Sequence, residues 1–301
     1  MPVSLAYICV VLIWSTTPLA IKWSTEGVGY LFGVTSRMGI GMVVAVLICA
    51  LTGIGLPLHR RALLTYVASG TGVFLTMLFC YWAVQFIPSG WISVIFGLSP
   101  VITSLLGSLV LRERLVSVTR TGSLIVSLTG LYVMFHHSME VDSKIAHGIF
   151  AVIAGVLCYS TSLVAIKAMA AEIRPVMTMT GTLIITVLLF SLTWYLSGSE
   201  LPAIIPTRAA GAILYLGIFG SVLGFVLFYF VLQKIEATRA ALITLITPGC
   251  ALILGNLFNN EPLTPAIGGG CLLVLMGLIL FEFGDAIVLM LRKAKVPAKL
   301  K

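Results

Sequence analysis

The sequence predicts an all-α membrane protein in which ten transmembrane helices form two inverted five-helix repeats. Three observations predict this fold: the composition, the number of long apolar runs, and a stretch of sequence that occurs twice. Of the 301 residues, 59% are hydrophobic and only 9% are charged, whereas soluble domains carry about 25% charged residues. The chain therefore needs a lipid bilayer as its solvent, and we expect it in the inner (plasma) membrane.

Apolar runs of sufficient length to cross the hydrocarbon core, about 20 residues in a helix, follow one another along the whole chain. Their length and their lack of alternation exclude a membrane β-barrel. Turn-forming segments such as GIGLP and NNEPLTP separate them. The runs lie near residues 3–21, 30–51, 62–84, 89–111, 118–135, 147–166, 176–197, 209–232, 240–259 and 265–290.

Lysine and arginine residues indicate the side of the membrane on which each loop lies. With ten spans both termini lie on one side, and 14 of the 18 Lys and Arg residues fall on that side. Three fall on the other side, and Arg37 lies within the second run. Because positively charged loops stay in the cytoplasm, we expect both termini there. The net charge of +8 thus reflects topology, and no nucleic-acid partner is expected.

The duplication is visible at two offsets. Residues 81–115 and 229–263 agree at ten positions when shifted by 148 residues, and WSTTPLAIK matches YSTSLVAIK at a shift of 145. Each half therefore holds five helices. Because five is odd, the second half enters the membrane from the opposite side and is inverted relative to the first. Inverted halves are typical of carriers that work by alternating access. We expect a first repeat at 1–137, a connecting loop at 138–146, a second repeat at 147–291 and a basic cytoplasmic tail at 292–301.

Two kinds of residue interrupt the apolar runs. Pro100 and Pro248 are repeat mates near mid-membrane, where a proline bends a helix, and either a hinge or a static kink fits them. Arg37 stands eight residues into the second run, roughly 12 Å from the helix end. A charge there costs about 2.5–3.5 kcal/mol unless it is paired or wetted. One hypothesis is that it holds a substrate carboxylate or phosphate. The other is that it snorkels outward or binds backbone carbonyls of a neighbouring helix.

The pattern LIWSTTPLAIK, the arginine in the second run and SPVITSLLGSLVLRE resemble the drug/metabolite transporter superfamily, EamA type. Two EamA repeats would cover essentially the whole chain. The resemblance implies a basket in which helices 1, 3, 4, 6, 8 and 9 line a central cavity, with helices 5 and 10 outside it. Such relatives export amino acids and other small metabolites, or carry nucleotide sugars, phosphorylated sugars or choline. Ser15 replaces the glycine usual in the family, and with its mate Ser160 it places two hydroxyls near the expected cavity.

Aromatic side chains are expected around this cavity. Trp14 and Tyr159 are repeat mates deep in their runs, and Tyr81 and Tyr229 are mates nearer a helix end. Such rings would suit a flat apolar substrate or an organic cation. The alternative is the aromatic belt at the membrane surface, which is favoured for Trp91. The full predicted substrate cavity consists of Trp14, Ser15, Arg37, Tyr81, Trp91, Phe96, Tyr159, Ser160, Phe225 and Tyr229.

The remaining reactive side chains predict neither a cofactor nor a metal. The six cysteines lie in separate apolar runs without a CxxC pair, and the four histidines lie in loops or at helix ends. Glu113 and Glu261 end helices, where a wetted carboxylate is expected rather than a proton relay. A membrane-embedded lipid-modifying enzyme, the alternative of another class, would need a cluster of catalytic groups at one interface.

The sequence thus predicts a secondary transporter rather than an enzyme. It would move small organic metabolites across the inner membrane, and the resemblance favours export of amino acids or related compounds. A carrier of choline-like cations is the alternative. The expected partners are a small-molecule substrate and the lipid bilayer, with the protein a monomer or a weak homodimer. Proton antiport and facilitated diffusion both fit.

Overall fold

The computed structural model describes residues 2–110, 118–141, 143–169, 173–234 and 237–295. All regular structure in these ranges is helical, which confirms the all-α prediction. The elements in chain order are α1 (Val3–Thr25), α2 (Tyr30–Leu51), α3 (Arg60–Ala83), α4 (Ser89–Phe96), α5 (Ser99–Val110), α6 (Val118–Val141), α7 (Ser143–Met169), α8 (Pro175–Leu196), α9 (Thr207–Tyr215), the π-helix η1 (Leu216–Leu223), α10 (Gly224–Lys234), α11 (Ala237–Asn259) and α12 (Pro265–Lys295).

Eight helical segments of the described chain are long and apolar enough to cross a membrane. One of them combines α4 and α5, and another combines α9, η1 and the first part of α10. Two further apolar helices, 121–136 in α6 and 246–259 in α11, are shorter. Large apolar side chains such as Leu12, Phe150 and Leu188 are exposed, as a surface that faces lipid requires.

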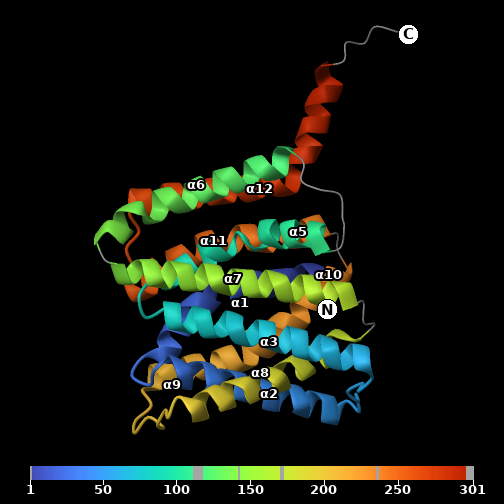
Figure 1. Cartoon of the computed structure of the whole chain (residues 1–301), viewed down its shortest axis with the longest axis vertical. Helices are drawn as coiled ribbons and strands as arrows, with labels where there is room; N and C mark the ends of the chain where they lie inside the picture. Colours follow the sequence, from blue (N-terminus) through green and yellow to red (C-terminus); the bar gives the residue numbers. More distant parts are fainter. Residues whose placement is uncertain (1, 111–117, 142, 170–172, 235–236, 296–301) are drawn as a thin grey trace.

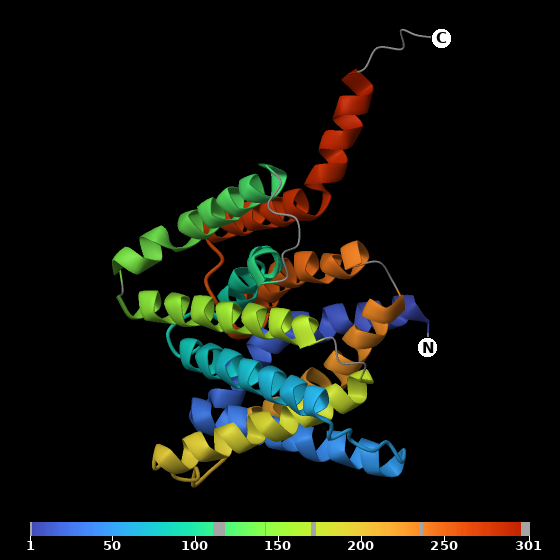
Figure 2. The ribbon, with the colours of Figure 1, turned by 45° about the vertical axis from the view of Figure 1, so that its right-hand side comes forward.

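The helices lie side by side in layers (Figure 1). The pair α6 and α12 covers one side of the bundle, α2 and α8 lie at the opposite side, and α1 runs through the middle. In both ribbon views, α1 begins and α12 leaves the bundle on the same side (Figure 2). This arrangement places the centre of the bundle around α1.

Glycines bring α6 and α12 into contact. A Cβ atom on Gly130 would lie 2.6 Å from the carbonyl oxygen of Gly270, and one on Gly270 would lie 2.5 Å from the carbonyl oxygen of Gly130. The two backbones therefore touch, as small residues allow in membrane helices. The result is a tight outer pair beside the rest of the bundle.

The two repeat-mate prolines lie in different local structures. α4 ends at Phe96 and α5 begins at Ser99, and the N–H of Gly97 between them bonds to two α4 carbonyls at 3.0 and 3.1 Å. Pro100 is the second residue of α5, where its missing N–H removes no helical hydrogen bond. α11, in contrast, continues through Pro248. Of the two prolines, Pro100 alone adjoins a break in its helix.

Candidate substrate cavity

A cavity of about 170 Å³ lies among α1, α2, α3, α4, the start of α5, α7, η1, α10 and α11. A single water needs only about 10–15 Å³ on the same measure, so the cavity has room for a small organic molecule. Its wall combines residues from both halves of the chain. The described residues that form it come from elements other than α6 and α12, in keeping with the place that the resemblance implies for helices 5 and 10.

Four of the predicted aromatic residues line this cavity: Trp14 of α1, Phe96 of α4, Tyr159 of α7 and Phe225 of α10. The rings of Trp14 and Phe225 meet edge to face with centroids 6.4 Å apart. Those of Phe96 and Tyr159 are tilted and 6.0 Å apart. Each pair joins one half of the chain to the other and presents an apolar face to the cavity.

Arg37 of α2 brings a charge to the same wall. The residue is only 2% exposed. Its Nε donates to Ser221 Oγ over 3.0 Å, and Nη1 lies 3.9 Å from the sulfur of Met77, a weak acceptor. Within the described part of the chain, no carboxylate pairs with it. Because a guanidinium has five N–H donors, these contacts leave most of them for a ligand or for water.

The π-helix η1 provides the seat for Arg37. A Cβ atom on Gly220 would lie 3.2 Å from Arg37 Nη2, and one on Gly217 would lie 3.2 Å from the Arg37 carbonyl oxygen. The two glycines therefore let η1 approach α2 closely, and the next residue, Ser221, supplies the hydrogen-bond acceptor. π-helical turns are frequent at functional sites. The sequence analysis missed this element, for which the GIFGS spacing opposite a buried arginine was the available signal.

A second, smaller recess of about 40 Å³ adjoins Arg37. Arg37 and Phe225 belong to the walls of both the cavity and the recess. The recess also contains the hydroxyl-bearing residues Ser69, Thr182 and Ser221. Its volume suits a few water molecules, which would solvate the guanidinium from the side away from the cavity.

The two serines of the repeat lie behind the cavity wall. Ser15 is 3% exposed and Ser160 is fully buried. Ser160 Oγ donates to the carbonyl oxygen of Ser99 over 3.4 Å, and Ser99 itself lines the cavity. The hydroxyl of Ser15 has no hydrogen-bond partner within the described residues. Ser160 thus supports the wall instead of forming it.

Two further predicted aromatics are packed in the helical core. Tyr81 is fully buried and its hydroxyl accepts from Ser24 Oγ over 3.4 Å. Trp91 is 2% exposed and packs on Phe135 at 4.7 Å, so it belongs neither to the cavity wall nor to a membrane-surface belt. The side chain of Tyr229 and the whole of Glu113 lie outside the described residues.

Polar wall residues that the sequence analysis did not select include Thr17, Thr76, Ser93 and Thr247, together with the thiol of Cys80. Thr17 Oγ1 donates to the carbonyl of Ile13 over 2.7 Å, and Thr76 Oγ1 to that of Gly155 over 3.2 Å. Their hydroxyl oxygens remain available as acceptors. A few polar groups in a mainly apolar cavity are typical of small-molecule sites.

Comparison with known proteins identifies the family. The profile of the EamA-like transporter family matches residues 1–136 and again residues 146–283. The chain belongs to the EamA-like transporter family. It is a multi-pass membrane protein of the drug/metabolite transporter type, and its family is one of transporters rather than of enzymes.

Several relatives of this EamA-like transporter are similar over most of their length. An "Uncharacterized transporter" of Archaeoglobus fulgidus is 30% identical over 64% of this chain and 67% of its own. The "Uncharacterized transporter YoaV" of Bacillus subtilis is 25% identical over 93% and 97%. A "Probable terminal-alkyne amino-acid exporter" of Streptantibioticus cattleyicolor is 23% identical over 89% of each chain. A crystal structure at 19% identity shares the fold, with a TM-score of 0.67 over 97% of this chain and 98% of the other.

Proposed function

We propose that this EamA-like transporter moves small organic carboxylates, above all amino acids, across the membrane. The observation that carries the proposal is Arg37, a buried guanidinium on the wall of an aromatic cavity with no carboxylate partner among the described residues. A buried charge costs several kcal/mol when it is left alone. A substrate carboxylate would neutralise this charge in the bidentate geometry that arginine favours.

The rest of the cavity fits the other parts of an amino acid. The faces of Trp14, Phe96, Tyr159 and Phe225 suit an apolar or aromatic side chain. Hydroxyl oxygens such as those of Ser93 and Thr247 can accept hydrogen bonds from an ammonium group. The name of the Streptantibioticus relative, a probable amino-acid exporter, supports this substrate class, and we extend it to export here.

We further propose that transport proceeds by alternating access between two inverted halves. The support is the doubled family match together with an expected odd number of spans in each half.

In this topology both termini lie in the cytoplasm of a cell whose inner membrane holds the protein. Ser143→Cys and Ser199→Cys should then react with an impermeant thiol reagent from outside, whereas Leu58→Cys in the loop between α2 and α3 should not. The reverse pattern would refute the orientation.

Transport in proteoliposomes tests the substrate class. Purified protein is reconstituted, loaded with one unlabelled compound, and assayed for exchange against radiolabelled amino acids. We expect exchange for free amino acids and little for the matching amino-acid amides, which keep the ammonium group and side chain but lack the carboxylate. Equal exchange of acids and amides would contradict the role given to the carboxylate.

Carriage of choline-like cations is the second candidate, because the four aromatic rings offer faces that attract an organic cation. Arg37 argues against it, since a cation beside a buried guanidinium is repelled. Choline is therefore the decisive competitor in the same assay. Exchange of choline without exchange of amino acids would favour this second function.

A further inference from the structure

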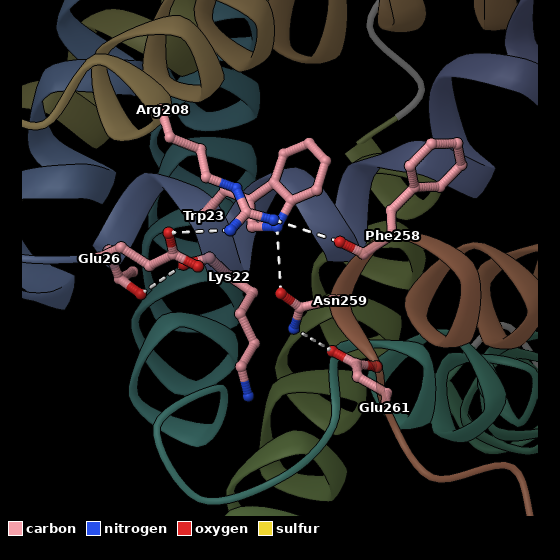
Figure 3. Close-up of polar contacts among 8 residues, drawn as sticks. Lys22, Trp23, Glu26, Arg208, Phe258, Asn259 and Glu261 are labelled. Atoms are coloured by element: carbon pink, nitrogen blue, oxygen red, sulfur yellow. Dashed lines mark hydrogen bonds and ion pairs between the residues drawn. The ribbon is translucent and has the colours of Figure 1, made fainter.

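A continuous chain of polar contacts connects several helices at one end of the bundle. We call this end the outer end, defined as the end at which α1 finishes at Thr25, because the charge count places it outside. The contacts run through Glu26, Arg208, Trp23, Asn259 and Glu261 (Figure 3). Glu261 in turn accepts a hydrogen bond from the backbone N–H of Gly90. We call these six residues the outer latch. They connect α1, α4, α9 and the end of α11.

Glu261 is the buried member of the latch. It is 7% exposed, and its Oε2 accepts from the Gly90 N–H over 3.2 Å. Gly90 is the second residue of α4, where the backbone N–H groups lack helical partners and the helix dipole attracts an anion. A carboxylate from the second half of the chain therefore caps a helix of the first half. The sequence analysis expected a wetted group here, and the burial corrects that expectation.

A sharp turn places Glu261 at this point. Asn260 has a φ of 51°, a left-handed conformation that asparagine tolerates better than most residues. The chain then folds back, so that the Glu261 N–H bonds to the Gly255 carbonyl over 3.1 Å and the side chain of Asn256 bonds to the Glu261 carbonyl over 2.8 Å. Gly255 touches the carboxylate itself, and any side chain there would displace it.

The other latch contacts extend from Glu261 to the surface. Asn259 Nδ2 donates to Glu261 Oε1 over 3.1 Å, and Asn259 Oδ1 accepts from the indole N–H of Trp23 over 3.3 Å. The guanidinium of Arg208 lies 4.2 Å from the Trp23 ring centre and 3.6 Å from the carboxylate of Glu26. This last ion pair is more than a third exposed on both sides and contributes little. Glu261 and its hydrogen bonds are the main tie.

The latch lies directly beyond the cavity on two of the helices that it joins. Ile21 of α1 lines the cavity, and Trp23 of the latch is two residues further toward the outer end. Ile92 of α4 lines it as well, two residues from Gly90. α4 and α11 also pack closely here, since a Cβ atom on Gly90 would lie 2.9 Å from Leu252 Cα. We propose that the latch holds the outer end of the cavity closed, with Glu261 as its positioning residue.

The residues that match the latch in the other repeat cannot form the same contacts. At the repeat offsets, Trp23 corresponds to Ala168 and Asn259 to Leu111, neither of which can continue a polar chain. The same latch cannot be built from the matching residues at the other end. The latch is therefore particular to the outer end. This inference rests on the proposed alternating access and is independent of the substrate.

Accessibility of a cavity thiol tests the latch without any substrate, so its result is separate from that of the exchange assay. Cys80 lines the cavity, and the other five cysteines are replaced by alanine to leave it as the reporter. An impermeant thiol reagent is applied to each face of sealed vesicles in turn. We expect slow labelling of the parent from the outer face and, in Glu261→Ala, labelling at least about 10-fold faster, the effect of losing a hydrogen bond to a charged group.

Graded variants distinguish latch opening from misfolding. Glu261→Gln keeps one acceptor oxygen and should give a smaller increase. Trp23→Phe keeps the ring under Arg208 but loses the N–H to Asn259, so about a threefold increase is expected. Glu200→Gln, an exposed carboxylate in the loop after α8, is the matched control and should label at the parental rate. Ser93→Cys, also on the cavity wall, serves as a second reporter.

Two results would overturn the proposal. One is parental labelling of both reporters from the outer face in a folded Glu261→Ala or Glu261→Gln protein. The other is an equal increase from both faces, which would mean that the substitutions loosen the whole bundle.

Discussion

Helices α2 and α8 lie side by side in the bundle and come from matching parts of the two repeats, yet they use polar groups differently. At the offset of 145 residues that aligns the first helices of the halves, Arg37 falls on Thr182. Arg37 faces the cavity and reaches across to Ser221 on η1. Thr182 Oγ1 lies 2.7 Å from both Ser69 Oγ and the carbonyl oxygen of Thr178. Arg37 thus faces the cavity, whereas Thr182 connects α8 to α3.

The difference follows from whether each side chain can form its hydrogen bonds within its own helix. A threonine hydroxyl in a membrane helix bonds to the carbonyl four residues earlier, as Thr180, Thr182 and Thr186 of α8 all do. A guanidinium has no such local partner and must find one on another element or on a ligand. The two EamA repeats therefore differ at this position: only the first places a guanidinium on the cavity wall.

The largest expected effect is that of removing the charge from α2. Arg37→Met keeps the bulk and loses every donor, so exchange of a carboxylate substrate should fall about 100-fold, the loss of one or two charge-assisted hydrogen bonds. Arg37→Lys keeps the charge without the fork and should retain part of the activity. The measurement is the initial rate of exchange in proteoliposomes at equal protein level.

Stability data separate the two explanations for an inactive Arg37 variant. A protein that melts at the parental temperature but does not exchange amino acids supports the anchor. A Met variant that exchanges at the parental rate would show that Arg37 is idle, and the contrast with α8 would lose its meaning.

A tenfold effect on KM is expected for a substitution in η1 where it packs against Arg37. In Gly220→Ala the new methyl would lie 3.2 Å from Nη2, so the guanidinium must shift by a few tenths of an ångström. We expect about a 10-fold rise in KM, because misplaced donors weaken carboxylate binding, as one lost hydrogen bond would. Gly211→Ala on α9 meets nothing within 4 Å and is the matched control. Equal KM values for the two variants would remove η1 from the site.

Much of this arrangement was accessible from the sequence, because it depends on local properties. Hydropathy fixes the runs, and a charge within an apolar run identifies Arg37 whatever surrounds it. The sequence does not predict which side of a membrane helix faces the cavity. Lipid and protein core are both apolar, so apolar periodicity does not distinguish the face toward lipid from the face toward other helices. Of the aromatic residues predicted for the substrate site, Phe96 and Tyr159 line the cavity, whereas Tyr81 and Trp91 are packed elsewhere.

Features that depend on tertiary contact were beyond sequence reasoning. The π-helical turn at η1 packs closely against α2 through Gly217 and Gly220, and a single sequence records only these glycines. Glu261 was expected at the end of a helix, but α11 ends two residues earlier at Asn259, and the turn at Asn260 folds Glu261 against α4. Burial of such a group depends on a segment that lies 171 residues away in the chain.

The prolines extend the comparison of the halves to their fourth helices, with an effect of intermediate size. In Pro100→Ala the restored N–H can bond to the Phe96 carbonyl and join α4 to α5, whereas α11 already runs through Pro248. We expect Pro100→Ala to lower the turnover rate about threefold with KM unchanged, the kinetic effect of about one hydrogen bond. Pro248→Ala should lower the turnover rate less than Pro100→Ala does. Equal slowing by both substitutions would indicate two equivalent hinges, and no slowing by either would leave two static kinks.

The smallest effect on transport is expected from the threonine that matches Arg37. Thr182→Val keeps the shape of the side chain and removes the hydroxyl beside Ser69, so unfolding in detergent should become easier by about 0.6 kcal/mol, a typical value for hydrogen bonds between membrane helices. Exchange should stay within about twofold of the parent, because the hydroxyl is engaged with Ser69 of α3 and lines the small recess beside the guanidinium, not the cavity itself. Met179→Leu, on the same helix and in the same recess wall, removes no hydroxyl and is the control. A loss of transport in Thr182→Val as large as that in Arg37→Met would place the recess inside the substrate site, and both matching positions would then bind the ligand.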